Sequence, residues 1–223
     1  MTSALGIFGG TFDPVHYGHL RAADEVLDTL DLREVRMMPA RDPPHRGAPG
    51  ATAKQRVDML RLALQEFPRL RLDTREIERT GKSYTFDTLA ELRAQAPHRP
   101  LVLITGVDAF AGLPTWHRWQ EIPTLAHIAV VTRPGTSVEA ALRGPLAQLW
   151  KQRYSDDRHA LENAPAGTIF AVSVSPQPIS ATALRAALAE GSAGIAQVRG
   201  LLPAAVLTYI DQHALYRRPP DAT

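Results

Sequence analysis

Short apolar runs alternate along the chain with stretches in which apolar residues recur every three or four positions. The short runs predict buried parallel strands at residues 3–8, 35–38, 70–77, 101–105, 127–132 and 168–172. The helical spacing predicts helices near residues 20–30, 57–67, 86–92, 138–142, 183–188 and 203–210. This alternation predicts an α/β fold with a doubly wound, mostly parallel sheet and a helical C-terminal part.

Nothing in the pattern indicates a second domain. The sequence has no internal repeat or low-complexity tract, so residues 1–216 are expected to form a single domain. Residues 151–167 are polar and are interpreted as an excursion within it, and the Pro-rich residues 217–223 are expected to form a frayed tail. Ligands of such folds bind at the carboxyl ends of strands, so we expect the ligand-binding and catalytic residues in the loops that follow the predicted strands.

The amino-acid composition excludes several classes of protein for this chain. The absence of cysteine excludes a disulfide scaffold, a thiol nucleophile and a Cys-ligated metal site. No apolar run approaches the ~20 residues that span a bilayer, and residues 1–8 lack the basic start of a signal peptide, so we expect a cytoplasmic protein without a membrane partner. With 25 Lys and Arg against 23 Asp and Glu there is no basic stripe for nucleic acid, although local sites for small anions remain open.

The clearest chemical signal lies in residues 9–20, between the first predicted strand and helix. Gly9 and Gly10 let the backbone turn tightly and approach a ligand closely. A helix that begins near here directs unpaired N–H groups outward, and phosphate is their natural ligand. Asp13 is expected to cap this helix, with Pro14 as its first residue.

Two histidines in this segment are candidates for contacting the same anion. His16 and His19 are three residues apart and therefore share one face if both are helical. Their N–H groups can then stabilise charge that grows on phosphate oxygens during a reaction. Zinc ligation, or ordinary hydrogen bonding at a helix start, are alternative explanations of the pair.

A second anion-binding segment is predicted at residues 179–185, which open a late helix. Ser180 suits the N-cap, and Thr182 and Arg185 are spaced to point the same way. Two hydroxyls, backbone N–H groups and a guanidinium can together hold phosphate. Taken alone, the segment is better explained by an N-cap and a surface arginine, so its interpretation as a phosphate site depends on its pairing with the first segment.

Together the two segments resemble a known superfamily. Gly-Gly-Thr-Phe-Asp-Pro-Val-His-Tyr-Gly-His and Ile-Ser-Ala-Thr-Ala-Leu-Arg are similar to the two motifs of the nucleotidyltransferases that carry His-x-Gly-His, and most similar to bacterial nicotinate-nucleotide adenylyltransferases. The likeness covers nearly the whole chain apart from residues 151–167. It implies a Rossmann-like fold and transfer of AMP from ATP to the 5′-phosphate of nicotinate mononucleotide, a step of NAD biosynthesis that yields deamido-NAD and pyrophosphate. It also implies ATP and nicotinate mononucleotide as partners. Mg²⁺ is the expected cofactor, carried mainly by the ATP phosphates because this hard ion keeps its waters and needs few protein ligands, so no metal site of the protein's own is expected.

The resemblance also suggests roles for individual residues. His16, His19 and Arg185 are expected to be catalytic, stabilising charge on the α-phosphate and the departing pyrophosphate. ATP is expected to contact a set of residues spread over four loops: Gly9, Gly10, Thr11, Gly106, Asp108, Arg133, Ser180 and Thr182. The nicotinate nucleotide, with a tryptophan stacked on its pyridine ring, is expected to contact a second set: His45, Arg46, Tyr84, Thr85, Trp116 and His117.

Several alternatives stay open. Pantetheine-phosphate adenylyltransferases share Gly-Thr-Phe-Asp-Pro but typically carry Thr where this chain has His16. Nicotinamide-nucleotide enzymes differ mainly in preferring an amide to a carboxylate. Class I aminoacyl-tRNA synthetases share His-x-Gly-His, but their Lys-Met-Ser-Lys-Ser motif is absent from this sequence. A non-catalytic nucleotide-binding module would tolerate the loss of a histidine or of Arg185, and the sequence predicts no oligomeric state.

Overall fold

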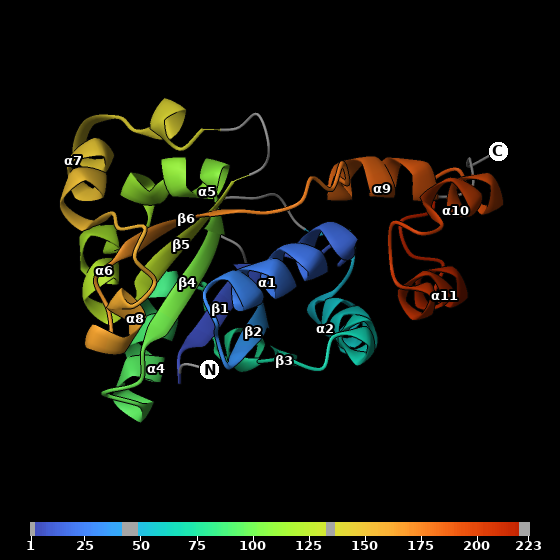
Figure 1. The fold of residues 1–223 in the computed structure, drawn as a ribbon. Coiled ribbons are helices and arrows are strands. Elements are labelled where there is room, and N and C mark those ends of the chain that lie inside the picture. The colour runs from blue at the N-terminus through green and yellow to red at the C-terminus, as the bar shows by residue number, and fades with distance from the viewer. Residues whose placement is uncertain (1–2, 42–48, 133–136, 219–223) are drawn as a thin grey trace.

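A sheet of six parallel strands in the order β3-β2-β1-β4-β5-β6 forms the centre of the molecule (Figure 1). The computed structural model of the chain describes residues 3–41, 49–132 and 137–218. The strands are β1 Leu5–Gly10, β2 Glu34–Pro39, β3 Leu70–Leu72, β4 Leu101–Gly106, β5 His127–Thr132 and β6 Ile169–Ser173. The predicted parallel α/β fold is confirmed.

Helices cover both faces of this sheet and bury two separate sets of apolar side chains. Successive side chains of a strand point to opposite faces, so β4 contributes to both sets. Val102 and Ile104 pack with α1 (Tyr17–Thr29) and α2 (Ala53–Ala63) on one face. Leu101 and Leu103 pack with α4 (Thr85–Gln95) and α5 (Val107–Ala111) on the other. The α-helices are α1 Tyr17–Thr29, α2 Ala53–Ala63, α3 Arg75–Glu78, α4 Thr85–Gln95, α5 Val107–Ala111, α6 Ile122–Leu125, α7 Gly144–Arg153, α8 Ala160–Asn163, α9 Ala181–Leu188, α10 Ser192–Val198 and α11 Ala204–Gln212. Single 3₁₀ turns are η1 Leu64–Glu66, η2 Leu113–Thr115, η3 Trp119–Glu121 and η4 Glu139–Ala141.

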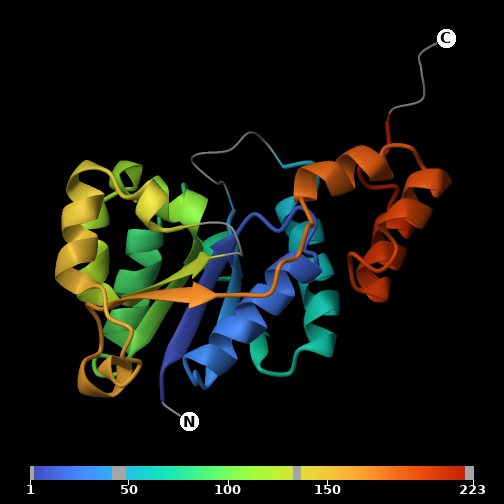
Figure 2. The same ribbon diagram turned by 45° about the horizontal axis from the view of Figure 1, so that its top comes forward.

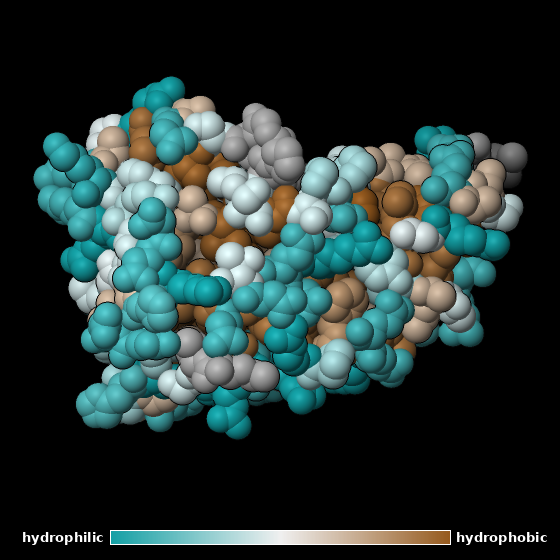
Figure 3. All heavy atoms as spheres, viewed as in Figure 1, coloured by the Kyte–Doolittle hydropathy of each residue, from teal (hydrophilic) through white to brown (hydrophobic). Residues whose placement is uncertain are grey.

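The predicted C-terminal helical part consists of α9, α10 and α11, which lie beside α1 and α2 rather than over the sheet (Figures 1 and 2). The backbone N–H of Tyr17 donates to the carbonyl of Leu201 at 3.1 Å, which joins the start of α1 to this part. Hydrophobic residues are visible around these helices among hydrophilic neighbours (Figure 3). Within the described ranges, no helix combines the length and the apolar content that crossing a bilayer requires.

Some predicted elements differ from the observed ones. The strand predicted at residues 70–77 ends at Leu72, because the Asp73 carboxylate accepts the backbone N–H of Arg75 at 3.2 Å and turns the chain into α3. The helix expected at residues 138–142 is only the single turn η4. Helix α10 was not predicted, since only Gly194 and Val198 are buried along it and its apolar period is weak.

The imidazole of His127 is buried at the start of β5. Its Nδ1 accepts the N–H of Thr168 at 3.1 Å, so the proton is on Nε2, which donates to the carbonyl of Ala164 at 2.9 Å. Burial lowers the pKa of His127 below its usual 6.5. The unfolded chain therefore takes up this proton more readily than the folded one, so the histidine's contribution to stability is complete above about pH 6.5 and lost as the pH falls.

We expect His127→Gln to weaken the acid sensitivity of the fold. Each unit of pKa difference between folded and unfolded chain is worth about 1.4 kcal/mol, and Gln does not titrate. Melting temperatures measured between about pH 7.5 and about pH 5.5 should fall less steeply for His127→Gln than for the wild type. The exposed His98 provides the control, and His98→Gln should keep the wild-type slope. Equal slopes in all three proteins would show that His127 does not couple folding to pH.

Candidate active site

The carboxyl ends of β1 and β4 mark the point where the strand order reverses. The chain winds outward from β1 through β2 and β3, and then returns to place β4 on the other side of β1. Ligands of doubly wound sheets bind in the crevice at this point. Gly9, Gly10 and Thr11 lie at the end of β1, and Gly106 and Asp108 lie at the end of β4, where Gly106 is the N-cap of α5.

The segment that leaves β1 makes a tight loop before α1. A Cβ atom on Gly10 would lie 3.0 Å from the ring of Phe12, which itself has a left-handed backbone with φ of 49°. Glycine at position 10 therefore leaves room for the Phe12 ring. The predicted N-cap role of Asp13 is wrong, because α1 begins at Tyr17 with His16 at the N-cap. Tertiary contacts take the Asp13 carboxylate away from the helix end, as described below.

The structure brings the two imidazoles together. The ring of His16 is buried and stacks on that of His19, with centroids 3.7 Å apart and planes at 26°. The ring of Phe12 also packs edge-on against the His19 ring, with the ring centroids 5.2 Å apart. A Cβ on Gly18 would lie 2.9 Å from Nδ1 of His16, so the glycine of His-x-Gly-His leaves the space that this ring occupies.

We expect Gly18→Ala to separate activity from stability. The added methyl group must displace the His16 ring, whereas alanine is favoured over glycine within a helix by about 1 kcal/mol. Turnover in the reaction proposed below should fall by about tenfold or more, since small misplacements of catalytic groups are costly. The melting temperature should stay level or rise. A variant that keeps wild-type turnover would show that the position of the His16 ring does not matter.

The second motif meets the first. Helix α9 begins at Ala181 with Ser180 as the predicted N-cap, and Thr182 is exposed on its first turn. The Nη1 atom of Arg185 donates to the backbone carbonyl of Asp13 at 2.7 Å, across 172 residues of sequence. This contact lies three residues before His16. The Arg185 guanidinium is therefore bonded to the loop that leads into the two histidines.

The residues predicted to contact a nicotinate ring come from two segments that also meet. Tyr84 is the N-cap of α4 and Thr85 its first residue, while Trp116 and His117 follow η2. The rings of Tyr84 and His117 lie 4.6 Å apart. Trp116 is half-buried and packs against the core on this face of the sheet. Three further candidates lie outside the described residues: His45, Arg46 and Arg133.

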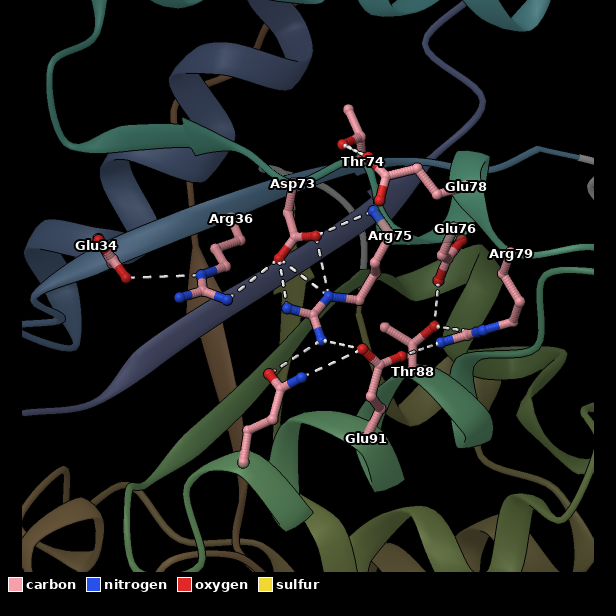
Figure 4. A network of polar contacts seen from close by, with 11 residues as sticks. Glu34, Arg36, Asp73, Thr74, Arg75, Glu76, Glu78, Arg79, Thr88 and Glu91 are labelled. Atoms are coloured by element: carbon pink, nitrogen blue, oxygen red, sulfur yellow. Dashed lines mark hydrogen bonds and ion pairs between the residues drawn. The ribbon is translucent and has the colours of Figure 1, made fainter.

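A polar network holds α4 in place behind Tyr84 and Thr85 (Figure 4). The Thr88 hydroxyl donates to Glu76 at 2.7 Å and accepts from Arg79 at 3.1 Å. Burial raises the pKa of the Glu76 carboxyl above its usual value. Arg79 also binds Glu91 of α4. These contacts join α3 and the following loop to α4, so the start of α4 is fixed relative to β3.

A buried arginine that was not among the predicted site residues lies beside the β1–α1 loop. Arg56 is 1% exposed and donates to the carbonyl of Thr11 at 2.8 Å and to that of Arg41 at 3.1 Å. The sequence does indicate that Arg56 is buried, because it falls on the apolar face of α2. The other buried positions on this face include Met59, Leu60 and Ala63. An arginine on an apolar stripe indicates a buried polar partner.

Tyr216 was missed as well, and nothing in the local sequence marks it. Its hydroxyl donates to Oδ1 of Asp13 at 2.7 Å. The other oxygen of this carboxylate, Oδ2, accepts the backbone N–H of Gly50 at 2.7 Å, and Oδ1 also accepts that of Ala51 at 3.1 Å. The one acidic side chain of the β1–α1 loop is thus occupied by protein donors. Among the residues that the structure describes, no three His, Cys, Asp or Glu side chains are grouped so that they could hold a metal ion.

Comparison with known proteins gives consistent results. A family model described as cytidylyltransferase-like matches residues 7–187. A protein of Dechloromonas aromatica described as probable nicotinate-nucleotide adenylyltransferase is 48% identical over 219 residues, covering 97% of this chain and 99% of the relative. One of Stenotrophomonas maltophilia with the same description is 45% identical over 225 residues, covering 98% and 99%. The structure of Plasmodium falciparum nicotinic acid mononucleotide adenylyltransferase complexed with NaAD superposes with a TM-score of 0.73 at 15% identity, covering 96% of this chain and 97% of that one, which supports the fold.

Proposed function

The chain belongs to the cytidylyltransferase-like family and, within it, to the nicotinate-nucleotide adenylyltransferases, and from this premise we propose that it transfers AMP from ATP to nicotinate mononucleotide. The products are deamido-NAD and pyrophosphate, and the reaction belongs to NAD biosynthesis. The observation that carries the proposal is the contact between Arg185 and the Asp13 carbonyl at 2.7 Å. It brings the two anion-binding motifs together beside the stacked histidines.

The reaction is a displacement at the α-phosphorus of ATP. An oxygen of the nicotinate mononucleotide phosphate forms the new P–O bond, and the bond to the β-phosphate oxygen breaks, with its electron pair leaving on pyrophosphate. The attacking phosphate has a second pKa of about 6 and is already largely dianionic at neutral pH, so no general base is required. The difficulty is to bring two polyanions into line and to stabilise the charge that shifts to the leaving group.

The first motif supplies donors for this charge. The stacked rings of His16 and His19 lie at the start of α1, where the N–H of Tyr17 is already bonded to the carbonyl of Leu201. Gly9 and Gly10 allow close approach of the backbone, and the Thr11 hydroxyl orients an oxygen. In this proposal the imidazoles stabilise the α-phosphate as its charge redistributes.

The second motif faces the leaving group. Arg185 presents a permanently charged, planar donor at the same loop, and Ser180 and Thr182 stand at the start of α9 with their side chains exposed. They are assigned to the β- and γ-phosphates. Gly106 and Asp108 at the end of β4 are assigned to the adenosine, and Arg133 to phosphate.

The neighbouring strand ends would hold the nicotinate nucleotide. Trp116 stacks on the pyridine ring in this proposal, while Thr85 and the backbone near His117 meet its carboxylate. The paired rings of Tyr84 and His117 support this assignment, because they join the two segments that must act together. His45 and Arg46 remain predictions for the same nucleotide.

Mg²⁺ is proposed as a cofactor carried by the ATP phosphates. A hard cation that keeps most of its waters needs few protein ligands, and the donors around the loop are suited to anions rather than to cations. When bound, the ion neutralises part of the triphosphate charge. The single domain of residues 1–216 is also a proposal, supported by one set of core residues that extends from Ala4 to Leu215. The cytoplasmic location stays a prediction.

Pyrophosphate release tests this function directly. The protein is supplied with ATP and Mg²⁺ together with nicotinate mononucleotide, nicotinamide mononucleotide or phosphopantetheine in parallel. We expect the highest kcat/KM with nicotinate mononucleotide, and loss of turnover when EDTA removes the metal. Preference for either other acceptor overturns the substrate, and no release with any acceptor favours a nucleotide-binding module.

A further inference from the structure

The buried carboxylate of Asp13 is the meeting point of three distant parts of the chain. Its side chain is 6% exposed and accepts the N–H groups of Gly50 and Ala51, directly before α2, and the hydroxyl of Tyr216, after α11. The same residue's backbone carbonyl accepts from Arg185 of α9. A buried carboxylate is tolerated only when donors satisfy it, so these contacts fix where Asp13 lies.

Tyr216 is held firmly where it meets Asp13. Its neighbour Leu215 is buried in the core, and the N–H of Leu215 donates to the carbonyl of Ile210 at 3.0 Å. A Cβ on Gly50 would lie 3.0 Å from the Tyr216 ring and 3.6 Å from Cδ of Arg185, so ring, glycine and arginine stem are packed together. Burial and the Asp13 carboxylate raise the pKa of the Tyr216 hydroxyl, which therefore remains a donor.

The β1–α1 loop is bound from two sides through its carbonyl groups. Arg56 donates to the carbonyl of Thr11 and Arg185 to that of Asp13, only two residues further along. Arg56 is enclosed by the protein, whereas about a third of the Arg185 side chain is exposed and can reach a ligand. The direction of the Arg185 guanidinium thus depends on where the Asp13 backbone is held.

We propose that Tyr216 is a positioning residue for AMP transfer, which fixes Asp13 through its hydroxyl and thereby aligns Arg185 with the triphosphate. The inference rests on the proposed function, in which Arg185 contacts the leaving group. It makes the turn that follows α11 part of the catalytic arrangement, although Tyr216 itself is not proposed to touch a substrate.

Tyr216→Phe tests the proposal, because it removes the hydroxyl and keeps the ring that packs on Gly50. We expect kcat to fall by about tenfold with KM for either substrate changed by less than about twofold, since an interaction that matters mainly in the transition state is lost. Tyr209→Phe is the matched control: its hydroxyl also donates to a carboxylate, that of Asp58 on α2 at 3.3 Å, and bonds to neither Asp13 nor Arg185. Both variants are compared at a temperature at which circular dichroism shows them folded.

A double-mutant cycle separates positioning from a general structural role. If Tyr216 acts through Arg185, Tyr216→Phe should change kcat by less than about twofold in an Arg185→Ala background. An equal tenfold loss in both backgrounds, or a Tyr216→Phe protein that behaves like Tyr209→Phe, overturns the inference. A wild-type protein without transfer to nicotinate mononucleotide would instead overturn the proposed function, so the two failures are distinguishable.

Discussion

His19→Ala is expected to lower kcat for AMP transfer by about a hundredfold to a thousandfold, the usual cost of removing one donor aimed at developing charge. The His19 ring lies between Phe12 and His16 and belongs to the third residue of α1, so it faces whatever the start of this helix binds. The other residues of that turn do not replace its N–H group, since Gly18 has no side chain, Leu20 is apolar and buried, and the Tyr17 hydroxyl donates to Glu66.

The fold should survive this substitution. His19 is only half-buried, the core-facing positions of α1 are other residues, and alanine is a strong helix former. A suitable control is His213→Ala, because His213 also stacks on an aromatic ring, that of Tyr209 at 4.0 Å, on the exposed C-terminal side. Stopped-time assays of pyrophosphate release should show the large loss only for His19→Ala. Turnover within tenfold of wild type would remove His19 from the proposed mechanism.

The two motifs were predictable because each combines local signals that need no knowledge of the fold. Paired glycines after an apolar run, histidines three apart and a hydroxyl-rich helix start all have meaning at short range. The end of the loop was not predictable in the same way. Local preference assigns Asp13 to the helix cap, but contacts with Gly50 and Tyr216, far away in sequence, determine where its carboxylate points.

The sheet follows from the sequence for a similar reason, since strands buried on both faces need continuous apolar runs. Residues 127–132 were predicted with their observed bounds. The predicted bounds were wrong where a polar side chain ends an apolar run, as Asp73 does after β3. Helix α10 was not predicted because it is held by close backbone packing rather than by a periodic apolar face. The first is a local turn within an apolar run, and the second depends on how closely the backbones of Gly194 and Ala187 approach, which apolar periodicity does not show.

Gly194→Ala is expected to cause the largest loss of stability among single methyl additions to the described glycines. A Cβ at this position would lie 1.7 Å from the backbone carbonyl oxygen of Ala187 and 2.5 Å from its carbon. Backbone atoms cannot rotate out of the way as a flexible side chain can, so α9 and α10 must move apart. Overpacking of this kind costs about 3 kcal/mol and exceeds the gain of about 1 kcal/mol that alanine brings to a helix.

For a chain of this size the net loss of about 2 kcal/mol corresponds to a fall in melting temperature of about 4–8 °C. Ala196→Ser, at an exposed position of the same helix, should leave the melting temperature within about 2 °C of wild type. Ala187 lies two residues after Arg185 on α9, so its displacement also moves the guanidinium that binds the Asp13 carbonyl. The kcat of Gly194→Ala should therefore fall below that of Ala196→Ser, even at temperatures at which both proteins are folded. Unchanged melting and turnover in Gly194→Ala would mean that α9 and α10 do not pack as closely as the structure has them, and that the position of Arg185 does not depend on that packing.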